Sequence, residues 1–221
     1  MRLEILPPDV NHSAWAFTIE GGRIRIGLGA VRNVGQAAVE SLVKARAEGG
    51  AFADLMDLAK RLDGRALNRR VVESLVASGA CDALGVERGR LFAAVGPLLD
   101  AAASLRRERE AGQSSLFGDG GDASIGVVAP PLPDVPEWTA RDRSAREKEV
   151  LGFYFSEHPL EPLRDEIGRI GTQTIAEAAE LDDGAEVRVV ALAGETKTIN
   201  TKAGRLMGIV QLEDLTGYRM T

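Results

Sequence analysis

The sequence is poor in the residues that form disulfides and metal centres: it has one cysteine, Cys81, and two histidines, His12 and His158. One cysteine cannot form an intrachain disulfide, and these three residues are too few for a structural zinc site, so no metal or other cofactor is expected in this segment. No apolar run approaches the ~20 residues that cross a membrane, and the N-terminus lacks the apolar core of a signal peptide. We therefore expect a cytoplasmic protein without a membrane partner.

Aromatic side chains and positive charge are also scarce. Phe, Trp and Tyr make up 5% of the 221 residues, so the core is expected to consist mainly of Leu, Val, Ile and Ala. The formal net charge of −6 argues against a uniformly basic nucleic-acid binder. Residues 22–70, however, hold ten Lys and Arg against five Asp and Glu. This basic segment is the part of the chain suited to face phosphates.

The basic segment contains a short turn, Asn33-Val34-Gly35, that leads into a helical pattern over residues 36–46. The first N–H groups of a helix lack intrahelical acceptors and carry partial positive charge, which suits a phosphate. Glycine at position 35 lets the backbone approach a phosphate closely or turn through positive φ. The candidate DNA-binding residues here are Arg32, Asn33, Val34, Gly35 and Gln36.

This turn resembles the helix-hairpin-helix, a module that holds nucleic acid through backbone amides. The module usually shows glycine, a hydrophobic residue and glycine, and Asn33 stands in the place of the first glycine. Asn tolerates the left-handed region better than other non-glycine residues, so the turn stays feasible. A plain helix–turn–helix packing unit is the alternative.

A second helix pair is expected downstream, because Asp54 and Asn68 are good N-caps and each precedes apolar residues at helical spacing. The loop at 63–68 lacks the glycine pattern, so we interpret it as a degenerate second hairpin. Its cations either meet phosphates or form a solvated basic face. They are Arg65, Arg69 and Arg70.

The middle of the chain changes from helical to polar. Residues 87–110 show a long helical pattern that Pro97 is expected to kink or break. Residues 112–136 are rich in Gly, Ser, Asp and Pro, which is typical of a linker. Within it, Leu116 and Phe117 are anchors for a partner's apolar pocket, with Gln113 hydrogen-bonding at the rim, or they pack on the chain's own surface.

Short strands are expected near the N-terminus. Residues 16–19 and 23–26 read as two strands around Gly21 and Gly22, a two-residue hairpin turn. An isolated hairpin is marginally stable in water, so we expect it to lean on a part of the protein upstream.

The C-terminal part is expected to begin with a helix at Thr139 and to end in strands. Period-two alternation predicts strands at 187–194 and 206–212, and a third follows a turn at 213–217. Three strands of a small barrel leave open edges, so we expect the chain to continue beyond them. His158 has no second His, Cys or Ser nearby, and catalysis there is not expected.

Taken in order, these stretches resemble the alpha subunit of bacterial DNA polymerase III, the C-family replicative polymerase. The resemblance runs essentially from end to end, and this order is more specific than any single motif. The residues that carry it are Leu6-Pro7-Pro8-Asp9-Val10-Asn11, Gly27-Leu28-Gly29-Ala30-Val31, Asn68-Arg69-Arg70-Val71, Ser78-Gly79-Ala80-Cys81-Asp82, Gln113–Phe117, Leu151–Leu160 and Leu212-Glu213-Asp214-Leu215-Thr216-Gly217.

The resemblance implies an α+β multidomain fold. Its parts would be the end of the fingers region at 1–26, a tandem helix-hairpin-helix domain at 27–111, a linker with a clamp-binding peptide at 112–138, a helical connector at 139–175 and a partial antiparallel OB-fold at 176–221.

The same resemblance implies duplex DNA, the sliding clamp and other replicase subunits as partners, and single-stranded DNA at the OB-fold. Family polymerases carry their catalytic aspartates in a palm domain far upstream, where Mg²⁺ would act. No part of this chain matches that region, so no catalytic residue is expected here. The error-prone C-family polymerase shares the layout, and an independent non-catalytic DNA-binding and clamp-binding adaptor is the alternative of another class.

Overall fold

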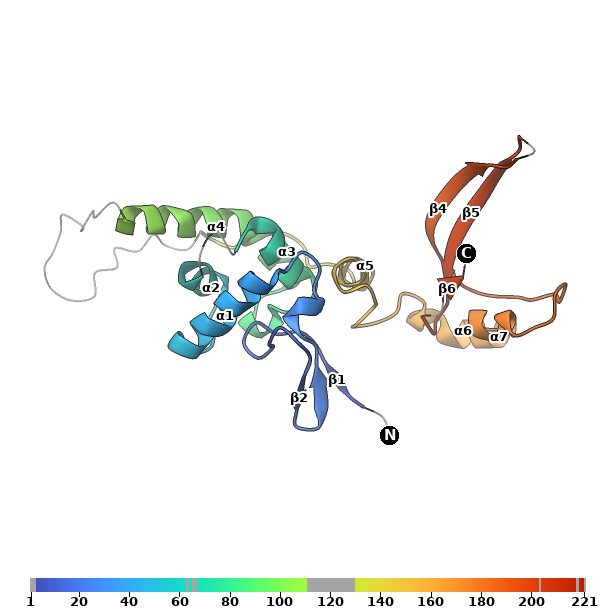
Figure 1. The fold of residues 1–221 in the computed structure, drawn as a ribbon, viewed down its shortest axis with the longest axis horizontal. Coiled ribbons are helices and arrows are strands. Elements are labelled where there is room, and N and C mark those ends of the chain that lie inside the picture. The colour runs from blue at the N-terminus through green and yellow to red at the C-terminus, as the bar shows by residue number, and fades with distance from the viewer. Residues whose placement is uncertain are drawn as a thin grey trace, which may run out of the picture. The chain divides into compact units, whose positions relative to one another are not determined.

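The computed structural model describes residues 3–62, 64, 67–110, 130–202, 204–217 and 219–220. The chain divides into two compact units, Met1–Phe155 and Ser156–Thr221. The first is mainly helical and the second holds a small antiparallel sheet, which confirms the predicted α+β class (Figure 1). Within the residues described, no helix has the length and apolar character needed to span a membrane.

The first unit opens with a three-stranded sheet of β1 (Ile5–Leu6), β2 (Thr18–Glu20) and β3 (Arg23–Arg25) in the order β1-β3-β2. Strands β2 and β3 form the predicted antiparallel hairpin, and Gly21 and Gly22 both have positive φ, as its tight turn requires. Strand β1 pairs parallel to β3 and was not predicted. Its two residues are too few to show alternation, so only the long-range pairing reveals it.

The helices of the first unit follow the predicted order. They are η1 (Leu28–Ala30), α1 (Gln36–Gly49), α2 (Leu55–Arg61), α3 (Arg69–Ala77), η2 (Asp82–Leu84), α4 (Arg88–Glu110) and α5 (Ala140–Leu151). The three predicted N-caps are confirmed, because the side chains of Asp54, Asn68 and Thr139 accept hydrogen bonds from the backbone N–H three residues on.

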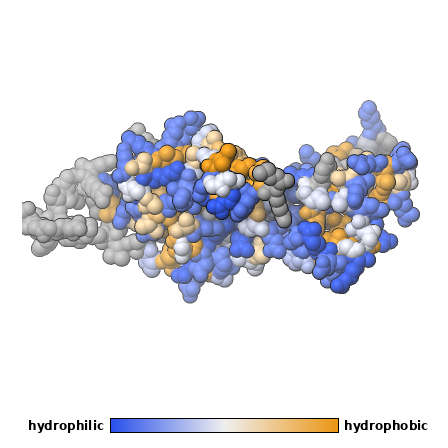
Figure 2. All heavy atoms as spheres, turned by 90° about the horizontal axis from the view of Figure 1, so that it is seen from below, coloured by the Kyte–Doolittle hydropathy of each residue, from blue (hydrophilic) through white to orange (hydrophobic). Residues whose placement is uncertain are grey.

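The core of this unit is aliphatic, as the low aromatic content predicted. Side chains from α1 to α4 form one buried cluster, which Val150 and Leu151 of α5 join. Phe52 is the one aromatic side chain among the buried core residues that the structure describes. Figure 2 shows hydrophobic patches between hydrophilic residues on the visible surface.

Of the expected kink or break at Pro97, the break does not occur, because helix α4 runs unbroken through this residue. Proline removes one intrahelical hydrogen bond, but the neighbouring side chains of Val95 and Leu98 are buried in the core and hold both halves of the helix in place. Of the predicted linker, residues 130–138 are described. They have no helix or strand, and Leu132 and Trp138 pack against the core.

The second unit contains η3 (Glu161–Leu163), α6 (Arg164–Ile170), α7 (Ile175–Ala179), β4 (Leu192–Asn200), β5 (Leu206–Glu213) and β6 (Arg219–Met220). The sheet order is β4-β5-β6 with antiparallel pairs. Asp214 forms the predicted turn after β5 by accepting a hydrogen bond from the backbone N–H of Thr216 at 2.9 Å.

The predicted strand at 187–194 was misplaced. Residues 187–191 lie outside any strand, whereas β4 includes Thr196 to Asn200, which lie between the two predicted strands. The turn between Thr201 and Arg205 starts the pairing at Asn200 opposite Leu206, and β5 ends at Glu213 opposite Leu192. Residues before Leu192 therefore have no partner on β5. Hairpin register, not alternation alone, determines where this strand begins.

Candidate nucleic-acid interface

The predicted turn is built around Asn33. The backbone N–H of Val34 donates to the carbonyl of Val31 at 3.2 Å, and Asn33 has φ 66°, the one positive φ of a non-glycine residue in the described part of the chain. This is the left-handed conformation that the third residue of such a turn needs. Val34 directs its side chain into the core, where it is buried. We therefore assign Val34 an anchoring role and leave contact with a ligand to the backbone around it.

Helix α1 begins directly after this turn without a side-chain cap. Gly35 is its N-cap, and the first turn of the helix holds no acidic residue. The first helical hydrogen bonds come from the N–H groups of Ala38 and Val39, which donate to the Gly35 carbonyl. The three N–H groups before them, those of Gly35, Gln36 and Ala37, donate to no described protein group. The side chain of Gln36 turns away to Glu40. Three donors and the positive end of the helix dipole therefore remain available.

Gly35 itself is not required by the backbone. Its φ is −82°, so the idea that it turns through positive φ is wrong. A Cβ at this position would meet no atom within 4 Å. Gly29 is different, because a Cβ there would lie 2.7 Å from the Trp15 ring. Packing against Trp15 explains why position 29 is a glycine. At Gly35 the fold imposes no such limit and leaves open space beside the free amides.

Two hydrogen bonds from distant parts of the chain hold the turn. The side-chain amide of Asn33 donates to the hydroxyl of Ser74 on α3 at 3.0 Å, and the backbone N–H of Arg32 donates to the Val150 carbonyl at the end of α5 at 2.8 Å. Ser74 and Val150 did not stand out in the sequence. The available signal for Ser74 was a serine among the apolar residues of the predicted helix, and the structure shows this serine buried on α3.

Helix α5 is in turn fixed by a buried ion pair. Arg88 at the start of α4 donates to Glu147 on α5 at 2.6 Å and to both carboxylate oxygens of Asp82 at 2.7 Å. The Glu147 side chain is completely buried. Hydrogen bonds with both carboxylates raise the pKa of Arg88, against the opposing effect of burial, which is larger than either alone. This arrangement keeps the Val150 carbonyl beside the turn.

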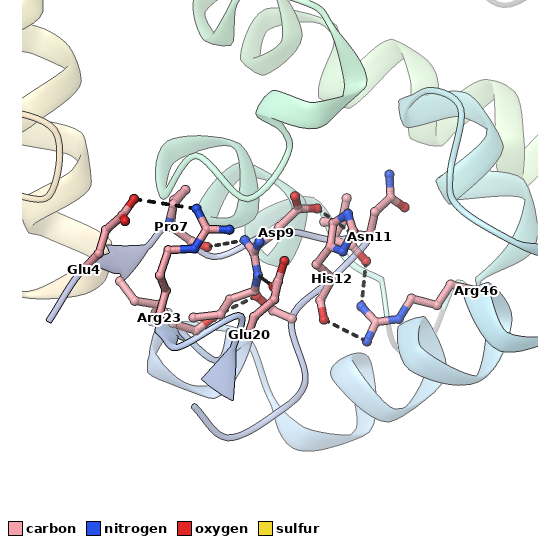
Figure 3. A network of polar contacts seen from close by, with 12 residues as sticks. Glu4, Pro7, Asp9, Asn11, His12, Glu20, Arg23 and Arg46 are labelled. Atoms are coloured by element: carbon pink, nitrogen blue, oxygen red, sulfur yellow. Dashed lines mark hydrogen bonds and ion pairs between the residues drawn. The ribbon is translucent and has the colours of Figure 1, made fainter. Parts of the chain in front are cut away.

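Several cations of the basic segment serve the fold. Arg46 donates to the carbonyls of Val10 and His12 (Figure 3). Arg61 binds the carbonyls of Ala45 and Gly50, and its guanidinium lies 4.5 Å from the centre of the Phe52 ring. Fewer of these side chains are therefore free to contact a ligand directly than the composition of residues 22–70 predicts.

The predicted site residues differ in whether their side chains are free to contact a ligand. Arg32 and Arg70 are exposed and form no ion pair with another described residue. Arg69 pairs with Glu73 at 2.7 Å, and hydrogen bonding to that carboxylate raises the pKa of Arg69. Arg65, Gln113, Leu116 and Phe117 lie outside the described residues.

No group of three or more His, Cys, Asp and Glu side chains in the described ranges is arranged to hold a metal ion. Cys81 is buried, and burial raises the pKa of its thiol far above the usual range. Its protonated, enclosed sulfur is an inert part of the core.

Comparisons with known proteins agree with this geometry. A family model described as a helix-hairpin-helix motif matches residues 2–91. The DNA polymerase III subunit alpha of Vibrio cholerae is 34% identical over 98% of this chain, and that of Caulobacter vibrioides is 35% identical over 97%. The Mycobacterium leprae protein of the same name is 37% identical over 97% of the chain.

The chain spans about a fifth of the length of these curated relatives, 19%, 19% and 18% respectively. The match to the family model and the similarity to these alpha subunits agree with the resemblance seen in the sequence. The chain is therefore homologous to one segment of the DNA polymerase III alpha subunit, and its residues 2–91 match the family model of a helix-hairpin-helix motif.

Proposed function

We propose that this chain is the part of a bacterial replicative DNA polymerase that grips duplex DNA without reading its sequence. The observation that carries the proposal is the set of three free backbone amides at Gly35, Gln36 and Ala37, beside a glycine whose open side would admit a phosphate. Arg32, in the same turn, and Arg70, at the start of α3, are the exposed cations expected to add attraction.

Binding of a random-sequence duplex by the whole chain tests this function. Because the contacts are with phosphates, we expect weak binding without sequence preference and a log–log salt slope of about −0.9 for each phosphate neutralised. Arg32→Ala and Arg70→Ala are each expected to make the total salt slope less steep, because each removes a cation that faces phosphate. Binding that does not change with salt, or that depends on base sequence, would contradict the mechanism.

Gly35→Val tests the amide contact more directly. Its φ is negative and its surroundings are open, so valine fits the free protein, whereas its side chain would occupy the space of an incoming phosphate. We expect a larger loss of affinity than Arg46→Ala causes, because Arg46 serves the fold. Gly168→Val in α6 is the matched control, since a Cβ there also meets nothing within 4 Å. Unchanged affinity of a folded Gly35→Val protein would refute the amide contact.

The proposal extends to the sliding clamp and the replicase. Gln113, Leu116 and Phe117 would bind the clamp as an extended peptide, and the β4–β6 unit would belong to an OB-fold that meets single-stranded DNA. The support is the pattern of these residues together with homology to the polymerase alpha subunit. DNA synthesis with Mg²⁺ would be the work of other parts of the whole polymerase.

A further inference from the structure

We infer that Asn33 and Ser74 are a positioning pair, which holds the amide-bearing turn in register with α3 so that both face one stretch of DNA. The inference rests on the proposed function. Its basis is the 3.0 Å hydrogen bond from Nδ2 of Asn33 to Oγ of Ser74, two residues separated by 41 positions.

The conformation of Asn33 alone gives no reason for asparagine. A φ of 66° costs a glycine nothing, whereas any residue with a Cβ is less stable there. Asparagine is tolerated in this region, and only its side chain supplies the donor that reaches Ser74. The hydrogen bond therefore gives Asn33 a role that glycine could not fill.

Ser74 connects the turn to the second candidate hairpin. It is buried on α3, and Arg70 is exposed about one helical turn earlier on the same helix. The bond from Asn33 thus ties the turn to the helix that presents this exposed cation. Together with the bond from Arg32 to Val150, it prevents the turn from shifting independently of α3 and α5.

A double-mutant cycle in the whole chain tests the pair. Asn33→Gly keeps the backbone conformation and removes the donor, while Ser74→Ala removes the acceptor. Each change is expected to weaken binding of a random-sequence duplex by up to about fivefold, because the released turn must be ordered again on binding and one neutral hydrogen bond limits that cost. The double variant should bind like either single variant, because both changes remove one interaction. Additive losses would overturn the pairing.

Ser78→Ala is the matched control. Ser78 is also buried at α3, but its hydroxyl donates to the carbonyl of Leu75 and does not touch the turn. This variant should lose stability and keep its DNA affinity. An equal loss of affinity in Ser78→Ala would show that general destabilisation explains the effect, and would overturn a positioning role.

Amide hydrogen exchange provides a readout that does not need DNA. In Ser74→Ala and Asn33→Gly the N–H of Val34, bonded across the turn, should exchange faster than in the wild type, and in Ser78→Ala it should not. An unchanged exchange rate of the Val34 N–H in Ser74→Ala and Asn33→Gly would overturn the positioning role of the pair, even if the chain binds DNA. Faster exchange in a chain that fails to bind duplex DNA refutes the proposed function and supports the pair's control of the turn.

Discussion

Arg88 and Glu147 lie 59 residues apart in the sequence and form an ion pair of 2.6 Å in which the carboxylate is completely buried. Residues 111–129 separate them along the chain and are not described. The pair joins α4 to α5, and the end of α5 in turn supplies the Val150 carbonyl that binds the turn at Arg32. A helix from beyond the predicted linker is therefore part of the candidate DNA site.

Removal of this carboxylate should strongly destabilise the first unit. Glu147→Ala leaves Arg88 partly enclosed with one carboxylate fewer, and we expect the free energy of unfolding to fall by about 3–5 kcal/mol. Glu48→Ala, which breaks an exposed pair with Lys44, should cost less than about 1 kcal/mol. Denaturant titration of both variants measures the difference, and similar losses would contradict the structural role of Glu147.

Acid should selectively remove the contribution of Glu20 to the stability of the fold. A hydrogen bond from Arg25, aided by the charge of Arg25, holds the pKa of Glu20 below its ordinary value of 4.5, with burial opposing the shift. A carboxylate with a lowered pKa adds stability above its ordinary pKa, and that stability is lost as the pH falls through the folded value. Wild type and Glu20→Gln should differ in melting temperature at neutral pH and converge in acid. A difference that persists in acid would contradict this linkage.

The thiol of Cys81 should react only when the protein opens. Its side chain is buried, and burial, followed by the charges of Asp82 and Asp9, raises its pKa. A disulfide reagent should therefore label native protein at the rate of local or global unfolding, and faster as denaturant is added. Ala145→Cys adds an exposed thiol on α5 as a positive control. Immediate labelling of Cys81 in native protein would contradict its enclosure.

The peptide around Leu116 and Phe117 should bind the clamp without supporting the fold. Each side chain contributes roughly 1.5–3 kcal/mol if fully buried in a partner, and ordering of the peptide offsets part of this. Affinity for the isolated site is then on the order of micromolar. Tethering on DNA would strengthen it through effective concentration.

Replacing both Leu116 and Phe117 by Ala should therefore abolish clamp binding and leave the melting temperature almost unchanged. A clamp titration and a melting curve on this double variant measure both quantities. If the pair instead packs on the chain's own core, the variant will lose stability and retain its clamp affinity.

Local chemistry in the sequence determined much of the fold. The caps at Asp54, Asn68 and Thr139 and the turn at Gly21 and Gly22 were predictable, because each depends on hydrogen bonds or backbone angles within a few residues. The position of the candidate turn before α1 was predictable for the same reason. The sequence also contained the order of motifs by which the polymerase resemblance was recognised.

Tertiary structure alone decided how these elements meet. The parallel partner of β1, the start of β4 and the continuity of α4 through Pro97 depend on register and packing with distant residues. The tethers of the turn at Ser74 and Val150 are long-range as well. No periodicity or spacing encodes such contacts, because a hydrogen bond between distant residues exists only once the intervening chain has packed and brought its donor and acceptor together.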